Sequence, residues 1–132
     1  MTLVVDATVV VAALIDNGDD GRWAESLLTS QDLAAPQLVQ VEVANVLRRA
    51  AAAGEVSSDA ATLAHADLLD LPIQLFPYEP FAARVWELRD NVTAYDGWYV
   101  AIAESIDAPL ATLDHRLVRA AGPRCEFVVG GR

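Results

Sequence analysis

The sequence predicts a three-layer α/β/α sandwich with a short central parallel sheet. Short β-type runs alternate with longer segments of helical periodicity along the whole chain. The helical segments are long enough to return the chain to the same end of a sheet, as parallel βαβ units require. The chain has 132 residues, of which 54% are hydrophobic, enough to bury the core of one domain. We therefore expect a single α/β domain over residues 1–132.

Two short apolar runs predict the strands in the first half of the chain. Leu3–Val5 is largely β-branched and ends directly at Asp6. Leu33–Ala35 is a weaker strand signal, because two of its three residues are alanine, and the run stops at Pro36. Between them, the apolar segment Thr8–Ile15 ends at an Asp-Asn-Gly sequence that is typical of a turn.

Helical periodicity accounts for the rest of the first half. One helix is expected over Gly21–Ser30, and a second over Gln37–Ala53 with Gly54 as its C-terminal stop. The residues expected on the buried faces of these two helices are Trp23, Leu27, Leu28, Leu38, Val41, Val46 and Leu47.

Capping residues, prolines and apolar spacing define the elements of the second half. The predicted strands are Ile73–Phe76, Leu110–Thr112 and Glu126–Val129. The predicted helices run from Ser57 or Ser58 to about Leu71, from Pro80 to about Arg89, and over Asp114–Ala121. A further helix is expected to start at Asp96, with Val100, Ala103 and Ile106 on one side.

The charge of the chain is strongly acidic, with a formal net charge of −10 and no lysine. Proteins that bind nucleic acid through their general surface field are usually basic, so charge alone favours a protein without a nucleic-acid partner. The other interpretation is local binding at an acidic site whose charge is partly offset by metal ions. The motifs have to decide between the two.

The cysteine content and the hydropathy indicate the compartment. Cys125 is the single cysteine, so it cannot form a disulfide within the chain, which fits a reducing cytoplasm. No apolar run reaches the roughly 20 residues that a membrane span needs. We expect a cytoplasmic protein without a membrane partner.

Four acidic residues lie where a parallel α/β sheet places its active site. Such sites form beyond the carboxyl ends of the strands. Asp6 ends the first predicted strand, Asp114 follows the strand at Leu110–Thr112, and Asp96 begins a helix that can face the same crevice. Glu42 is expected in a helix interior between two valines. If they converge, the four carboxylates form an oxygen-only ligand set, which suits Mg²⁺ or Mn²⁺.

Each acid also has a simpler explanation when it is taken alone. Asp96 and Asp114 can be helix N-caps, a common use of aspartate. Glu42 can be a solvated helix residue. Asp6 is harder to explain in this way, because aspartate is depleted in strands and here it follows Leu-Val-Val directly. Convergence of the four is therefore an assumption that spacing alone does not prove.

The segments that contain these acids resemble the PIN-domain nucleases, and most of all the VapC-type toxins of bacterial toxin–antitoxin pairs. They are Leu3–Val9, Val41–Leu47, Tyr95–Glu104 and Ala111–Leu117, and the resemblance extends over essentially the whole chain. It implies that the metal-binding, catalytic acids are Asp6, Glu42, Asp96 and Asp114. It also implies that the hydroxyls of Thr8 and Thr112 support them. Some members carry a further acid where this chain has His115 and Arg116, so the number of bound ions stays open.

The function implied by the resemblance is an Mg²⁺- or Mn²⁺-dependent endoribonuclease, a hydrolase that cuts RNA phosphodiester bonds with a metal-activated water. The implied partners are RNA, a cognate antitoxin that neutralises the toxin, and a second copy in a homodimer. One alternative is a catalytically inactive PIN-fold binding module, although such modules typically lose acids and this chain keeps all four. Another is an Mg²⁺-binding acidic-pocket regulator, which normally needs a lysine near its site.

Polar side chains near the acids have two interpretations each. Arg49 lies two helical turns after Glu42, and Arg116 and Arg119 follow Asp114 on one short helix. These arginines can bind RNA phosphates or simply balance surface charge. Asn45, one turn after Glu42, can hydrogen-bond the acids or satisfy local polarity.

Two aromatic residues, Trp98 and Tyr99, lie two and three positions after Asp96. Aromatic side chains near a nuclease site can stack on bases. An amphipathic helix more often buries them, so we expect both in the core.

Overall fold

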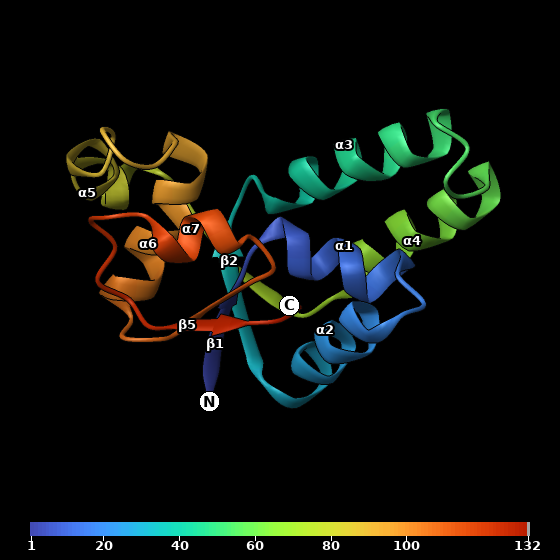
Figure 1. Ribbon diagram of the computed structural model, residues 1–132, viewed down its shortest axis with the longest axis horizontal. Helices are drawn as coiled ribbons and strands as arrows, with labels where there is room; N and C mark the ends of the chain where they lie inside the picture. The colour runs from blue at the N-terminus through green and yellow to red at the C-terminus, as the bar shows by residue number, and fades with distance from the viewer. Residues whose placement is uncertain (132) are drawn as a thin grey trace.

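The computed structural model describes residues 1–131 and has the predicted three-layer α/β/α architecture (Figure 1). Arg132, the last residue of the predicted domain, lies outside the described residues. Five strands form one parallel sheet in the order β3-β2-β1-β4-β5. The strands are β1 (Thr2–Val5), β2 (Asp32–Pro36), β3 (Ile73–Phe76), β4 (Leu110–Thr112) and β5 (Phe127–Val129).

The helices cover both faces of this sheet. In Figure 1, α1 to α4 lie on one side of the strands, whereas α5 and α6 lie on the other. The helices are α1 (Ala7–Ile15), α2 (Asp19–Ser30), α3 (Val39–Ala52), α4 (Ser58–Asp70), the 3₁₀ helix η1 (Glu79–Phe81), α5 (Ala82–Glu87), α6 (Ala94–Ser105) and α7 (His115–Arg119). None of these helices is long and apolar enough to cross a membrane.

The strand order places a topological switch point at β1. The chain moves outward from β1 to β2 and β3, then returns to add β4 and β5 on the other side. Val4 of β1 pairs with Leu110 of β4, and Leu3 pairs with Leu33 of β2. Ligands of open parallel sheets bind where the order reverses, beyond the carboxyl ends of the strands. That position lies just after β1 and β4.

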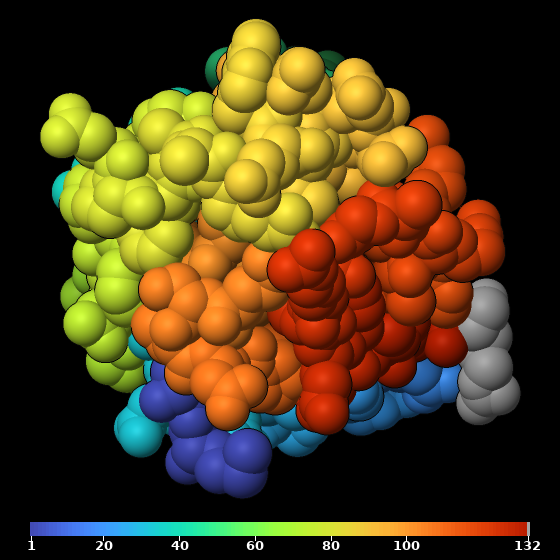
Figure 2. All heavy atoms as spheres, turned by 90° about the vertical axis from the view of Figure 1, so that its left-hand side faces the viewer, coloured from blue at the N-terminus to red at the C-terminus, as the bar shows by residue number. Residues whose placement is uncertain are grey.

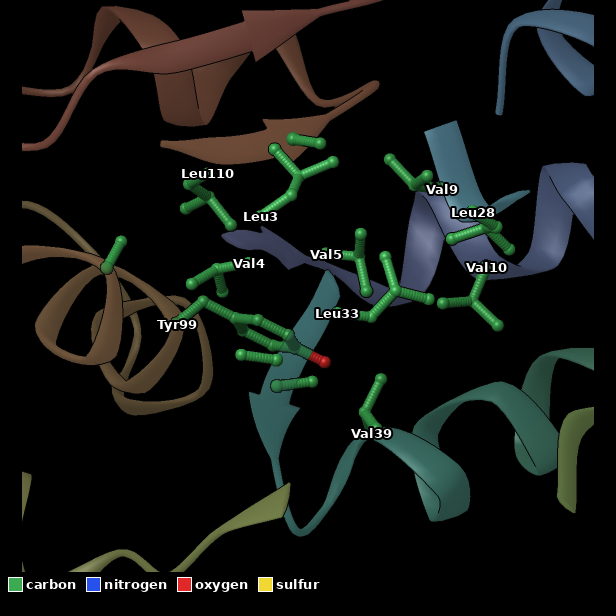
Figure 3. Packing of buried hydrophobic residues seen from close by; sticks show 14 of the residues in the cluster. Leu3, Val4, Val5, Val9, Val10, Leu28, Leu33, Val39, Tyr99 and Leu110 are labelled. Carbon is green, nitrogen blue, oxygen red and sulfur yellow. The ribbon is translucent and has the colours of Figure 1, made fainter. Parts of the chain in front are cut away.

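The core is built from aliphatic side chains of the central strands and the helices packed on them (Figure 3). Val4 and Val5 of β1 are fully buried, as are Val9 and Val10 of α1. Fully buried β-branched strand residues are expected in a parallel sheet that is covered on both faces. At the α1–α2 connection, a Cβ on Gly21 would lie 1.8 Å from the carbonyl oxygen of Asp16, so only glycine allows this close approach.

A network around Glu104 joins α5, α6 and the C-terminal segment. The yellow, orange and red parts of the chain to which these segments belong adjoin on the face shown in Figure 2. Arg84 of α5 donates to Glu104 of α6 from Nε at 2.7 Å and also donates to the carbonyl of Gly122 at 2.9 Å. The amide of Arg124 donates to the other Glu104 oxygen at 2.7 Å. The Glu104 carboxylate, 17% exposed, thereby fixes α5 and the C-terminal segment against α6.

The predicted apolar face of α3 is partly wrong. Val41 is 62% exposed, while the residues buried against the core are Val39, Val43, Leu47 and Ala50. Valines at 39, 41 and 43 give the sequence two possible apolar stripes, and only the position of the neighbouring elements selects one. Gly54, with φ of +77°, follows the end of α3 as predicted.

The segment predicted as one helix from Pro80 to about Arg89 is also different. It begins as the 3₁₀ turn η1 and continues as α5, which ends at Glu87. The amide of Leu88 donates to both Arg84 and Val85 carbonyls, so the helix tightens and ends there. A short apolar pattern with proline in its first turn cannot distinguish these two helical forms.

Candidate functional site

The four predicted acids lie at the ends of helices that begin near the carboxyl edge of the sheet. Asp6 is the N-cap of α1 and Asp114 is the N-cap of α7. Asp96 lies in the first turn of α6, and Glu42 in the first turn of α3. The N-terminal end of a helix carries partial positive charge, which stabilises carboxylates placed there.

Two predictions about these positions need correction. Glu42 is not in a helix interior, because α3 begins at Val39 and not at Gln37. Asp96 does not cap α6: Thr93 is the N-cap, and its hydroxyl oxygen accepts a hydrogen bond from the Asp96 amide at 3.1 Å. For Asp114 the capping interpretation holds, since its Oδ1 accepts from the amides of Arg116 and Leu117.

Asp6 is held by the largest set of hydrogen bonds in the site. Its side chain is buried, with 4% exposed. The hydroxyl of Thr8 donates to Oδ1 and the hydroxyl of Thr112 donates to Oδ2, both at 2.5 Å, and the Val9 amide also donates to Oδ1. Both threonine oxygens accept in turn from the turn after β4: the Leu113 amide donates to Thr8 at 3.0 Å and the Asp114 amide donates to Thr112 at 2.9 Å. The two threonines therefore join Asp6 to the segment that carries Asp114.

Glu42 has a partner that the sequence analysis did not anticipate. The hydroxyl of Tyr99 donates to Oε1 of Glu42 at 2.8 Å. The Tyr99 side chain is only 2% exposed, so the prediction that it belongs to the core is confirmed. A buried tyrosine hydroxyl usually finds a hydrogen-bond partner. Tyr99 lies three residues after Asp96 and so on the same side of the helix, and this spacing could have identified it as a residue near the acids.

Burial makes three of the four carboxylates costly to ionise. Burial raises the pKa of Asp6 to about 6, even though the hydrogen bonds from Thr112, Thr8 and Val9 act in the opposite direction. Burial also raises the pKa of Glu42 and of Asp96 above their ordinary values. Tyr99 partly offsets this effect at Glu42, as Thr93 does at Asp96.

Asp96 takes part in each repulsion between the acids that contributes to a raised pKa. The charge of Asp96 contributes to the raised pKa of both Asp6 and Glu42. The charge of Asp114 contributes to the raised pKa of Asp96 itself, while Arg116 acts against it. The four acids are therefore electrostatically connected, with Asp96 between the others.

The donor set fits a hard divalent cation in its chemistry, while the side chains are spread apart. All four groups are carboxylates, and oxygen ligands are those that Mg²⁺ and Mn²⁺ prefer. Within residues 1–131, no three acidic, histidine or cysteine side chains stand close enough together to hold one ion as they are placed. The Asp114 side chain is 28% exposed. The chemistry of the donor set therefore fits Mg²⁺ or Mn²⁺, and a bound cation would offset the repulsion between the carboxylates.

The predicted arginines lie at different distances from the acids. Arg116 is 89% exposed, its Nε is 3.8 Å from Oδ1 of Asp114, and it lines a hollow of about 240 Å³ with Asp96 and Asp114. Arg119 is exposed in the last turn of the same helix. Arg49 is exposed near the far end of α3, roughly 10 Å along the helix from Glu42.

The other predicted polar residue, Asn45, points to a neighbour on its own helix. Its side-chain oxygen accepts a hydrogen bond from Nε of Arg48 at 3.0 Å. This contact matches the local-polarity interpretation. Trp98, which was expected in the core, is half-buried against it and packs edge to face against Tyr78, with ring centroids 5.2 Å apart.

The fold and the site together define a class of protein: a small parallel α/β/α domain with connected carboxylates at the switch point of its sheet. The comparison with known families agrees with this class and makes it specific. Residues 3–123 match the family model of the PIN domain. The chain belongs to the PIN-domain family, and within it to the VapC type.

The relatives that support this assignment align over nearly their whole length. The chain is 41% identical to Ribonuclease VapC1 of Mycobacterium tuberculosis, over 94% of both chains. It is 34% identical to VapC ribonuclease Mb0985 of Mycobacterium bovis, over 96% of this chain and 97% of the relative.

Solved structures show the same fold at lower identity. VapBC2 of Rickettsia felis, crystallised with a DNA fragment from its promoter, superimposes with a TM-score of 0.68 at 14% identity over 98% of both chains. VapC20 of Mycobacterium tuberculosis, described as a Sarcin-Ricin loop cleaving toxin, superimposes with a TM-score of 0.68 at 16% identity over 88% of this chain and 92% of that one. These likenesses establish the fold.

Proposed function

We propose that this protein is a metal-dependent endoribonuclease toxin of a toxin–antitoxin pair. The observation that carries the proposal is the set of four connected carboxylates at the switch point, with Asp6 buried and held by two threonine hydroxyls. Its nearly full-length similarity to proteins named VapC ribonucleases supports RNA as the substrate. We propose a cytoplasmic location together with this function, in line with the single cysteine of the chain.

The residues that would hold Mg²⁺ or Mn²⁺ are Asp6, Glu42, Asp96 and Asp114. When bound, the ion supplies neutralisation of phosphate charge and acidification of a water molecule. The chain contributes a fixed anchor at Asp6, where hydrogen bonds to both oxygens favour the ionised carboxylate. His115 is not positioned as a base, since its Nε2 lies 3.1 Å from the Gly130 carbonyl oxygen and is engaged there.

An antitoxin and a second copy of the chain are the proposed protein partners. A groove of about 560 Å³ runs along α1, which Asp6 caps, and its lining is mainly apolar, with Val11 and Ile15 of α1 and Val46 of α3. Thr8, which bonds Asp6, forms part of its wall. An antitoxin segment with apolar residues in the groove could place a cationic side chain on the carboxylates. The assembly as a homodimer is proposed from the family resemblance alone.

The test of this function is cleavage of single-stranded RNA by the purified chain. We expect cleavage with millimolar Mg²⁺ or Mn²⁺, none with a chelator, and recovery when the ion is restored. We also expect expression of the chain alone to arrest growth, and co-expression of the cognate antitoxin to relieve the arrest. Cleavage at the same rate in chelator would refute the metal requirement. Absence of cleavage with either ion would refute the nuclease.

A second experiment tests the arginines as phosphate contacts. The double variant Arg116→Ala and Arg119→Ala should bind RNA more weakly, and the slope of log affinity against log salt should become shallower by roughly 1.4, about 0.7 for each contact with a single strand. Arg22→Ala on α2, which removes an exposed arginine paired with Asp19, is the control. An unchanged slope would assign both arginines to charge balance. Arg49→Ala, measured alongside, decides whether RNA reaches along α3.

A further inference from the structure

The geometry points to Tyr99 as a positioning residue that holds the carboxylate of Glu42 in the orientation needed for cation binding. This inference rests on the proposed function, because it assigns a role within the same site. It concerns a residue that does not itself contact RNA or the ion.

Tyr99 reaches the site from inside the core. Its ring lies among buried side chains, and its hydroxyl extends towards the beginning of α3 near Val39 (Figure 3). Only the hydroxyl meets the polar edge, where it donates to Oε1 of Glu42 at 2.8 Å. Because the ring is packed on all sides and 2% exposed, the position of the hydroxyl is fixed by the core. The contact therefore fixes a point on α3 relative to α6, which carries Asp96.

Glu42 accepts fewer hydrogen bonds than Asp6 or Asp114 does. Asp6 accepts from two threonine hydroxyls and one amide, and Asp114 accepts from two amides. Among the described residues, Tyr99 provides the side-chain hydrogen bond that reaches the Glu42 carboxylate. Glutamate also has one more rotatable bond than aspartate, so it has more conformations to lose. The bond occupies Oε1 and leaves Oε2 for a cation.

If the hydrogen bond between Tyr99 and Glu42 had only a structural role, the experiment would give a different result. In that case Glu42 would serve only to satisfy a buried phenol, as buried polar groups require. Removing the hydroxyl would then alter the melting temperature and leave cation affinity unchanged. Positioning predicts a loss of cation affinity that is measurable in a folded variant.

The test compares Tyr99→Phe with wild type by calorimetric titration of Mn²⁺. Loss of an outer partner of a metal ligand typically lowers affinity or activity about 10- to 100-fold, and we expect a loss of this size in Mn²⁺ affinity and in RNA cleavage below saturating Mn²⁺. Tyr95→Phe on the same helix, where the side chain is 59% exposed, is the matched control and should match wild type. In a Glu42→Gln background, Tyr99→Phe should have no further effect.

A spectroscopic measurement on the wild-type sequence covers the case in which Tyr99→Phe does not fold. The chain has three tyrosines, so incorporation of 3-fluorotyrosine gives three ¹⁹F signals, which Tyr78→Phe and Tyr95→Phe assign by elimination. Saturating Mg²⁺ should shift the Tyr99 signal more than the other two.

The outcomes separate the two proposals. Wild type that binds Mn²⁺ and cleaves RNA, together with an unaltered Tyr99→Phe or an unmoved Tyr99 signal, overturns the positioning role and leaves the nuclease intact. Wild type that neither binds Mn²⁺ nor cleaves RNA overturns both.

Discussion

Asp6→Asn is expected to reduce RNA cleavage by about two orders of magnitude or more while the protein stays folded. The substitution preserves the shape of the side chain but removes its charge, which is the property a cation needs. Most of the surrounding network can still form. An asparagine oxygen accepts from one threonine hydroxyl, and its amide group can donate to the oxygen of the other. A buried carboxylate with a raised pKa is costly at neutral pH, so its neutral replacement does not add to that cost.

The measurement is the cleavage rate at saturating Mn²⁺, together with the melting temperature in chelator. Asp107→Asn is the matched control: Asp107 has φ of +53°, which asparagine also adopts readily, and it lies just before β4 at the opposite edge of the sheet. Glu42→Gln, Asp96→Asn and Asp114→Asn should reduce cleavage in the same direction as Asp6→Asn. A folded Asp6→Asn that cleaves RNA at the wild-type rate would show that the site is elsewhere.

The fold could be predicted because local and global signals agree along this chain. The β-branched run before Asp6 and the helical segment ended by Gly54 each favour one conformation. Alternation of such segments leaves few topologies for a short parallel sheet. The position of Asp6 and Asp114 followed from the same argument, because residues that come directly after neighbouring parallel strands share one edge.

The side-chain contacts of the site could not be predicted in this way. The bond between Tyr99 and Glu42 joins residues 57 positions apart, and that between Thr112 and Asp6 joins residues 106 apart. Neither follows from periodicity, since each depends on how far a packed helix or strand brings one hydroxyl. The apolar face of α3 failed for a related reason: Val41 and Val43 are equally hydrophobic, and tertiary packing selected Val43.

The last expected result concerns the stability of the protein without metal, which should fall as the pH rises from about 4 to about 6. The Asp6 carboxyl has an ordinary pKa of 3.8 in the unfolded chain and a pKa of about 6 in the folded one. Between these values the folded state binds more protons than the unfolded state, so the free energy of unfolding decreases with rising pH. The loss from Asp6 is complete above pH 6 and amounts to about 3 kcal/mol at most. The raised pKa values of Glu42 and Asp96 act in the same direction.

A divalent cation that binds only the folded state should reverse this loss. At a hundred times its dissociation constant it stabilises the protein by about 2.7 kcal/mol, a rise in melting temperature on the order of 10 °C for a domain of this size. Asp96→Asn should behave differently on both counts. It removes one buried carboxylate and the charge that contributes to the raised pKa of Asp6 and Glu42, so in chelator it should melt no lower than wild type. Its stability should depend less on pH, and it should gain less from Mn²⁺.

Independent helix caps predict a different set of melting curves. Asparagine caps helices about as well as aspartate, so Asp114→Asn and Asp6→Asn would be nearly neutral, and no variant would respond to metal. Asp96 separates the two models most sharply. Thr93 and not Asp96 caps the N-terminus of α6, so the Asp96 carboxylate is not needed to begin the helix. Melting curves of wild type and Asp96→Asn at pH 4 and pH 7, in chelator and in millimolar Mn²⁺, provide the comparison. If the two proteins melt alike under all four conditions, the carboxylates do not form a common cation site.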